Sequence, residues 1–311
     1  MTPLQKIGAF GAALAVSFGA AYGLGSLIGP FDSGTKSEAK QSGHLGAGHE
    51  ESVSGGHDDG SPHDSGMDSG SEGTVTPAGL QVTEGGYSLD LKTPALTANG
   101  TATLKFAVRG KDGTPVTSYQ VEHEKELHLI VASRDLTEYR HLHPVRAADG
   151  TWSTPLTLRE AGSYRVFADF TPTGGGRNLT LGSDLTVAGA YEARKAPAPV
   201  REVTVEGYTV TLDGDLAAGK GSELGFAVSK EGRPVKLEPY LGANGHLVAL
   251  RTGDLAYLHV HPHDDKPGAA KVSFTADVPS TGTYRLFLDF KADGKVRTAA
   301  FTADTNQHSH N

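Results

Sequence analysis

Two short stretches of this 311-residue chain carry histidines at a spacing that could bind a metal ion. "YRHLHP" occupies 139–144 and "YLHVHP" occupies 257–262, so the pattern Tyr-x-His-x-His-Pro recurs after 118 residues. Alternate side chains of a strand share one face, and a proline marks the end of a strand because it lacks an N–H. Each stretch therefore predicts two imidazoles on one face near the rim of a sheet. The two pairs are His141 with His143, and His259 with His261.

A third histidine and a carboxylate accompany each pair. His128 precedes His141 by 13 residues (141 − 128), and His246 precedes His259 by 13 (259 − 246). Both begin apolar runs, "HLIVAS" and "HLVALR", which predict strands whose antiparallel return would bring the three imidazoles together. The apolar strands "YRVFADF" and "YRLFLDF" each contain one aspartate, and a buried carboxylate needs a partner because an isolated buried charge is costly. The two aspartates are Asp169 and Asp289.

Three imidazoles and one carboxylate form a ligand set that Cu(II), Zn(II), Ni(II) and Fe(II) accept, with intrinsic affinity highest for copper. The chain has two Met and no Cys, which argues against soft sites for Cu(I). The alternatives are that the histidines are packing or surface residues and that the two aspartates only orient a histidine. We expect one site in each copy. The predicted ligands are His128, His141, His143 and Asp169 in the first copy, and His246, His259, His261 and Asp289 in the second.

An internal repeat must position these residues. The segments "TATLKFAVRGKDGTPV" and "AGSYRVFADF" have counterparts "SELGFAVSKEGRPV" and "TGTYRLFLDF", in the same order and at similar gaps. Short alternating runs between Gly, Asp and Pro turn signals, without sustained helical periodicity, predict an all-β protein of two tandem immunoglobulin-like β-sandwich lobes. Tyr164 and Tyr284 are expected to be core or corner tyrosines. The lobes are expected at 79–190 and 201–304, joined by a linker at 191–200.

The segments outside the lobes differ sharply in composition. The 25 residues 7–31 carry no charge, which predicts that residues 1–30 are a transmembrane anchor or, alternatively, a cleaved signal segment, with the rest of the chain outside the cytoplasm. Residues 31–78 hold nine acids and two Lys and are rich in Gly, Ser and His, which predicts a disordered linker. The linker and the His-containing tail at 305–311 could be solvated segments or weak collectors of metal ions.

Several function classes fit the sequence poorly. The formal charge of −8 argues against binding nucleic acid, which relies on clustered Lys and Arg. The absence of Cys excludes disulfides and thiol catalysis. A cupin metal site needs a Glu soon after the His pair, and neither copy has one. The chain also lacks a Gly-x-Ser-x-Gly elbow and a Gly-rich phosphate loop.

The run "ELHLIVASRDLTEYRHLHP" resembles a motif of exported, membrane-anchored actinobacterial proteins with immunoglobulin-like lobes. This resemblance covers 79–304 and implies export and an association with heavy metals. The proposed site is also similar in style to that of periplasmic copper-binding proteins of the CopC type. The chain departs from those proteins because its amino terminus is hydrophobic and offers no terminal histidine as a ligand, so no residue is carried over from them.

We therefore predict an extracytoplasmic, membrane-anchored protein that binds or buffers copper, with zinc as the alternative metal, and that has no catalytic turnover. The metal ion and the membrane are its expected partners, and a protein partner is not indicated. A second hypothesis is an extracellular structural or interaction module without a metal site. A third is a metal-dependent exported enzyme, for which the chain shows no separate acid–base group.

Overall fold

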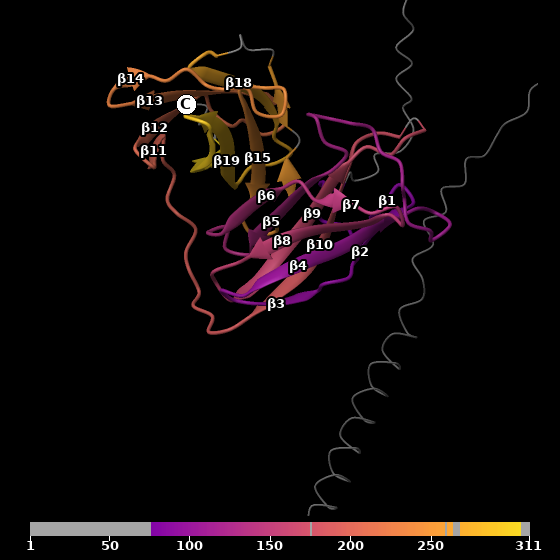
Figure 1. Ribbon diagram of the computed structural model, residues 1–311. Helices are drawn as coiled ribbons and strands as arrows, with labels where there is room; N and C mark the ends of the chain where they lie inside the picture. Colours follow the sequence, from indigo (N-terminus) through magenta and orange to yellow (C-terminus); the bar gives the residue numbers. More distant parts are fainter. Residues whose placement is uncertain (1–75, 175, 259, 264–267, 306–311) are drawn as a thin grey trace, which may run out of the picture. The chain divides into compact units, whose positions relative to one another are not determined.

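The computed structural model describes residues 76–174, 176–258, 260–263 and 268–305, and the side chain of His261 lies outside that description. Every regular element in these residues is a β-strand, and no helix occurs among them (Figure 1). The strands fall into four sheets, two formed by residues 83–188 and two by residues 202–304. The prediction of an all-β fold with two tandem sandwich lobes is confirmed.

Lobe 1 consists of two five-stranded sheets. The first sheet has the order β1 (Thr83–Glu84), β2 (Tyr87–Leu91), β4 (Thr101–Arg109), β8 (Thr151–Thr157) and β7 (Val145–Arg146). The second sheet has the order β3 (Ala95–Thr97), β10 (Leu179–Ala188), β9 (Gly162–Phe170), β5 (His128–Ser133) and β6 (Tyr139–Leu142). All pairings in this lobe are antiparallel except that of β10 with β3. The second sheet contains β5 and β6, the two strands that carry His128 and His141.

Lobe 2 repeats this plan with different strand lengths. One sheet has the order β11 (Glu202–Val205), β12 (Tyr208–Asp213), β13 (Gly221–Lys230), β18 (Lys271–Asp277) and β17 (Val260–Pro262), and β14 (Arg233–Pro234) also pairs with β13. The other sheet has the order β16 (Tyr257–Leu258), β15 (Gly245–Arg251), β19 (Thr283–Ala292) and β20 (Lys295–Asp304). The hexapeptide of lobe 2 thus contributes to both sheets, whereas in lobe 1 its first four residues form the single strand β6 and His143 follows that strand.

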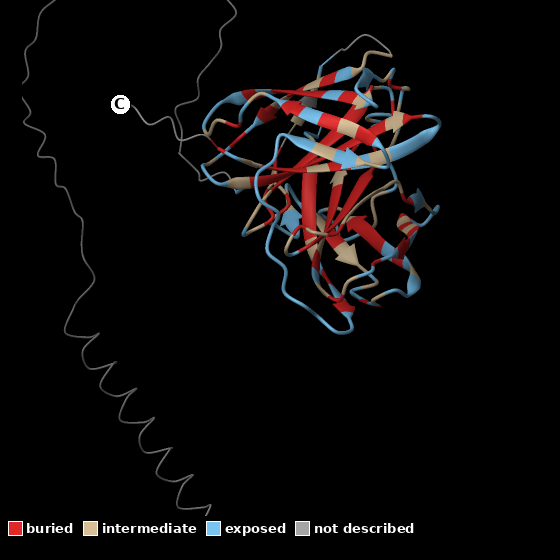
Figure 2. Cartoon of the chain, turned by 90° about the vertical axis from the view of Figure 1, so that its left-hand side faces the viewer, coloured by how far each residue is buried: buried red, intermediate tan, exposed pale blue. Residues whose placement is uncertain are grey.

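Each lobe has its own hydrophobic core between its two sheets, formed by the buried faces of the central strands (Figure 2). Tyr164 and Tyr284 are both buried in these cores, and each hydroxyl donates to a backbone carbonyl four residues upstream, at 2.8 Å to Glu160 and to Ser280. This arrangement is the tyrosine corner found in immunoglobulin-like sandwiches, and it confirms the prediction made for the two tyrosines.

A third apolar cluster lies where the two lobes meet. Its buried members come in repeat-equivalent pairs, including Ile130 with Val248 and Phe167 with Phe287. Tyr139 of lobe 1 stacks on Phe287 of lobe 2, with ring centroids 4.0 Å apart and an interplanar angle of 3°. The repeat-equivalent residues Tyr257 of lobe 2 and Phe167 of lobe 1 also pack together, with centroids 5.8 Å apart and the rings tilted by 49°. The lobes therefore share an interface built from the same positions of each copy.

The predicted anchor at 1–30, most of the predicted linker at 31–78 and most of the tail at 305–311 lie outside the described residues. Within the part of the chain that the structure describes, no helix has the length and apolar character to span a membrane.

Candidate metal site

The central strands of lobe 1 place the first histidine next to the predicted carboxylate. His128 opens β5 and lies opposite Asp169 of the neighbouring β9 in the antiparallel register. His141 lies on β6 opposite Ile130 of β5, and His143 follows two residues later, just past the end of the strand. The sequence "HLIVAS" is buried throughout, so this strand holds His128 within the body of the lobe rather than on its surface.

The three histidines predicted for lobe 1 lie together. One ring nitrogen from each of His128, His141 and His143 lies within 4.8 Å of the other two. The closest measured pair is His128 Nδ1 and His141 Nε2, which are 3.1 Å apart. Two nitrogens that are each about 2.0–2.1 Å from one ion lie roughly 2.9–3.4 Å apart when the angle at the metal is about 90–110°. The pair therefore already has the separation of two ligands of one ion.

The carboxylate beside this cluster comes from the other lobe. Asp289 Oδ2 accepts a hydrogen bond from His141 Nδ1 at 2.8 Å, and the two side chains are only 4% and 5% exposed. Asp289 Oδ1 accepts from the hydroxyl of Thr298 at 2.5 Å, so both carboxylate oxygens have partners. Sequence reasoning grouped Asp289 with the histidines of its own copy. The structure adds a contact with the histidine pair of lobe 1, because Asp289 of β19 lies at the interface between the lobes.

Asp169 makes the complementary contact to lobe 2. Its carboxylate accepts hydrogen bonds from the Thr180 hydroxyl at 3.4 Å and from the Tyr257 hydroxyl of lobe 2 at 3.5 Å. Asp169 does not belong to the group of converging donors formed by the three histidines of lobe 1. Each carboxylate therefore lies opposite the first histidine of its own copy and also contacts the opposite lobe, and the predicted ligand sets stay predictions.

His246 brings the second copy to the same region. Its Nε2 donates to the carbonyl of Tyr240 at 2.9 Å, and its ring centroid lies 6.2 Å from that of His128 and 6.4 Å from that of His141. Of its expected partners, Asp289 lies opposite it in the antiparallel register of β15 and β19, whereas His259 and the side chain of His261 lie outside the described residues.

Two hydrogen bonds determine which ring nitrogens of the cluster carry protons. A backbone carbonyl can only accept, so the contact of 3.2 Å from His128 Nε2 to the carbonyl of Glu122 places the proton on Nε2. The hydrogen bond that Asp289 Oδ2 accepts from His141 Nδ1 likewise places a proton on that nitrogen. In the neutral rings, the unshared electron pairs are then on His128 Nδ1 and His141 Nε2, the two atoms that face each other at 3.1 Å. Such a contact needs a proton or a cation between the two nitrogens.

Burial keeps several of these rings uncharged. It lowers the pKa of His128 to about 3, with the neighbouring His141 adding to the shift. It also lowers the pKa of His143 to about 3 and, with His123 adding to the shift, that of His246 to about 4. A neutral imidazole is the form that binds a metal ion, because protonation removes the electron pair.

Two buried side-chain atoms lack a hydrogen-bond partner in the described part of the chain, and both come from "YRHLHP". They are the hydroxyl oxygen of Tyr139 and Nε2 of His143. Buried polar atoms are nearly always satisfied, so an orphaned one calls for an explanation such as an ion. The ring nitrogen of His143 is placed for that role by its membership of the histidine cluster.

A cavity of about 250 Å³ borders the cluster. Both lobes line it, and the lining contains polar groups as well as apolar side chains such as Val260 and Phe274. The polar lining residues that matter for the site are His123, His128, His141, His246, Asp169 and Tyr257. The cavity gives small molecules or ions a route to the histidines.

Sequence reasoning did not assign a role to His123. Its ring lies 5.0 Å from that of His246 and 6.2 Å from that of His128, measured between centroids. His123 and Glu124 both have positive φ, 48° and 62°, in a tight turn closed by hydrogen bonds between Glu122 and Lys125. The equivalent turn of lobe 2 contains Leu241 and Gly242, so repeat comparison could not reveal the histidine.

Fold and site together define a protein of two packed β-sandwich lobes with a buried histidine cluster at their junction. The chain belongs to the family described as "Domain of unknown function (DUF8832)", whose model matches residues 81–189 and 203–307. The two matches correspond to the two copies of the repeat. A search of curated protein sequences found no match.

Similar solved structures include several chains of immunoglobulin-like domains. One is the Escherichia coli adhesin FdeC, which is 13% identical and gives a TM-score of 0.25. The match covers 72% of this chain and 65% of the FdeC chain, so this chain spans less than two thirds of the FdeC chain. Another is domains 4 and 5 of the S-layer protein SbsC, at 14% identity and a TM-score of 0.22, covering 72% of this chain and 98% of that one. At these scores neither likeness carries an argument about function.

Proposed function

We propose that the protein binds a transition metal ion, copper first and zinc as the alternative, at the histidine cluster between its lobes and without catalytic turnover. The observation that carries this proposal is the pair of facing nitrogens, His128 Nδ1 and His141 Nε2, 3.1 Å apart. Their other ring nitrogens are committed to Glu122 and Asp289, so both electron pairs point at one place. The third donor is a nitrogen of His143, and the cavity leaves room for an exchangeable ligand.

The contact with Asp289 fits a metal ligand. A histidine that binds a metal ion usually donates its second N–H to a carboxylate or carbonyl, which fixes the tautomer and raises the basicity of the ligand nitrogen. His141 donates to a carboxylate and His128 to a carbonyl, so both rings have the support that this chemistry requires. The proposed donors are all nitrogen, and Cu(II) and Zn(II) suit imidazole better than Mg(II) or Ca(II) do.

A titration of the full chain with Cu(II), in competition with a chelator of known affinity, tests the proposal. We expect His128→Ala and His141→Ala each to remove one ion per chain from the tight-binding fraction. His263→Ala is the matched control, since His263 is an exposed histidine of lobe 2 whose ring contacts Thr275. The linker histidines are present in every variant and their background cancels. Equal binding by all the variants and the wild-type chain would contradict the proposal.

One further reading of the cluster is favoured by a specific contact. If His141 carries both ring protons, its imidazolium pairs with Asp289 and donates to His128 Nδ1, which satisfies the 3.1 Å contact without a metal ion. The cluster would then serve only to join the lobes of a non-catalytic structural or interaction module. In that case the copper titration shows no site that depends on His141, whereas the thermal stability of His141→Ala is still reduced.

We also propose, from the composition of residues 1–30, that the lobes are outside the cytoplasm and are anchored to the membrane. Protease added to intact cells should then degrade the lobes, and degradation only after lysis would contradict this location. The assignment of His246, His259 and His261 to a metal site also stays a proposal, tested by the same titration with His246→Ala.

A further inference from the structure

A second cavity, whose lining residues differ from those of the first, lies where the two lobes meet. Its volume is about 310 Å³, and lobe 1, the linker that follows it and strands β19 and β20 of lobe 2 all contribute to its lining. Four arginines line it against two carboxylates, Glu138 and Glu160. The arginines are Arg140, Arg159, Arg194 and Arg285.

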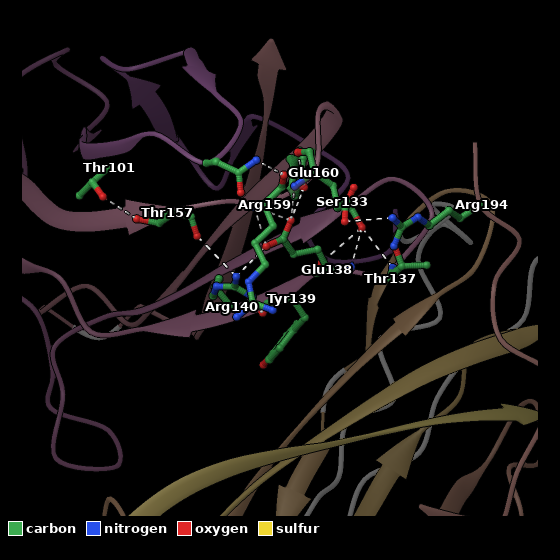
Figure 3. A network of polar contacts seen from close by, with 12 residues as sticks. Thr101, Ser133, Thr137, Glu138, Tyr139, Arg140, Thr157, Arg159, Glu160 and Arg194 are labelled. Atoms are coloured by element: carbon green, nitrogen blue, oxygen red, sulfur yellow. Dashed lines mark hydrogen bonds and ion pairs between the residues drawn. The ribbon is translucent and has the colours of Figure 1, made fainter. Parts of the chain in front are cut away.

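The two carboxylates already have partners. Glu138 is buried and accepts hydrogen bonds from Arg140 Nη2 at 2.6 Å and from the backbone N–H groups of residues 159 and 160 (Figure 3). Its Oε2 also lies 2.6 Å from the Tyr164 hydroxyl. Glu160 forms an ion pair with Arg194 at 3.0 Å. Two guanidinium groups of this cavity, those of Arg159 and Arg285, remain without a carboxylate among the described residues.

Arg285 is the stronger indication of a missing anionic partner, because its side chain is only 5% exposed. Its contacts are with neutral groups: Nη1 donates to the Thr302 hydroxyl at 2.7 Å and Nε to the carbonyl of Leu136 at 3.3 Å. Its guanidinium also lies over the ring of Phe287, 5.3 Å from the centroid. Burial lowers the pKa of Arg285, which reflects the cost of holding a charge there without a counter-ion.

Comparison of the two repeats shows which partner Arg285 lacks. In lobe 1 the equivalent residue is Arg165, and the residue opposite it in the register is Asp184, with which it forms an ion pair at 2.7 Å. In lobe 2 the residue opposite Arg285 is Thr302. The second copy thus has a hydroxyl where the first has a carboxylate, and its buried arginine faces a polar cavity instead.

We propose that this arginine-lined cavity binds a small divalent oxyanion, such as inorganic phosphate, independently of the metal site. The charge excess of two guanidinium groups matches a divalent anion, and guanidinium presents its N–H groups in a fork that fits phosphate and carboxylate oxygens. Arg285 is buried and Arg159 is exposed, so salt screens an anion's pairing with Arg285 less than its pairing with Arg159.

Calorimetric titration of the full chain with inorganic phosphate, in a low-chloride buffer at neutral pH, tests this inference. We expect one site with a Kd on the order of 0.1–1 mM for the wild-type chain. Arg159→Gln should weaken binding at least about fivefold without unfolding the chain, since no side-chain partner of Arg159 is lost. Arg177→Gln, at an exposed arginine of lobe 1 paired with Glu84, is the control and should bind as the wild type does.

A second variant separates loss of the site from loss of the fold. Thr302→Asp restores in lobe 2 the carboxylate that lobe 1 has at Asp184, so it should abolish phosphate binding while the melting temperature stays equal or rises. Acetate, titrated in parallel, should bind at least about tenfold more weakly than phosphate. Phosphate binding that Thr302→Asp and Arg159→Gln leave unchanged, or acetate binding as tight as that of phosphate, would overturn the inference.

Discussion

Replacing Asp289 by Asn tests the cross-lobe support of the metal site most directly. The change keeps the size of the side chain but removes the charge that faces His141 Nδ1 at 2.8 Å. Removal of such a supporting partner typically lowers metal affinity by about 10- to 100-fold, or about 1.4–2.7 kcal/mol. We expect the upper part of this range because the pair is nearly solvent-free, with 4–5% of either side chain exposed.

The assay is a competition titration with Cu(II), with the fold of each variant verified by its circular dichroism spectrum and melting temperature. Asp293→Asn serves as the control, because Asp293 is an exposed carboxylate of the same lobe that contacts Lys230 and Tyr208 rather than the cluster. Thr298→Ala removes only the hydrogen bond to the other oxygen of Asp289 and should have a smaller effect. If folded Asp289→Asn binds copper within about threefold of the wild-type chain, the carboxylate does not support the site.

Three further predictions concern stability. Unfolded histidine takes up a proton near pH 6.5, whereas burial holds His128 and His246 neutral down to pKa values of about 3 and 4. As the pH is lowered below about 6.5, the unfolding free energy of the metal-free chain should therefore decrease, by up to about 1.4 kcal/mol per pH unit for each of these two residues. Denaturant titrations at pH 7 and pH 5 measure this decrease. Phe287→Ala removes a buried ring stacked on Tyr139 and should cost about 3–5 kcal/mol in a urea titration. Copper at about 100 times its Kd should raise the unfolding free energy by about 2.7 kcal/mol in the wild-type chain and not in His141→Ala, as thermal melts would show.

The fold could be predicted because its signals are local. Alternating runs between turn residues, the repeated segments and the two corner tyrosines all reflect interactions within one lobe. The convergence of His128, His141 and His143 was also predictable, since a strand and its antiparallel return bring those positions together within a single sheet.

The contacts of the carboxylates across the lobe junction were not predictable in the same way. Asp289 reaches His141 across 148 positions of the chain, and only the packing of one lobe on the other brings them together. A repeated sequence suggests two self-contained copies, because it carries no information about exchanges between them. No role could be predicted for His123 for a related reason. Its ring lies next to that of His246 in the other lobe, and no sequence pattern within its own copy indicates this contact.

The lobe junction uses the same positions from both copies, as Leu136 and Leu255 show by sharing a positive φ, 57° and 65°, within one apolar cluster. A contact of this reciprocal kind is what two identical subunits form around a two-fold axis. One copy of the repeat, produced as a separate polypeptide, would carry both halves of such a contact. It should therefore associate with itself into a dimer, and the tandem chain can be understood as that dimer with its subunits covalently joined.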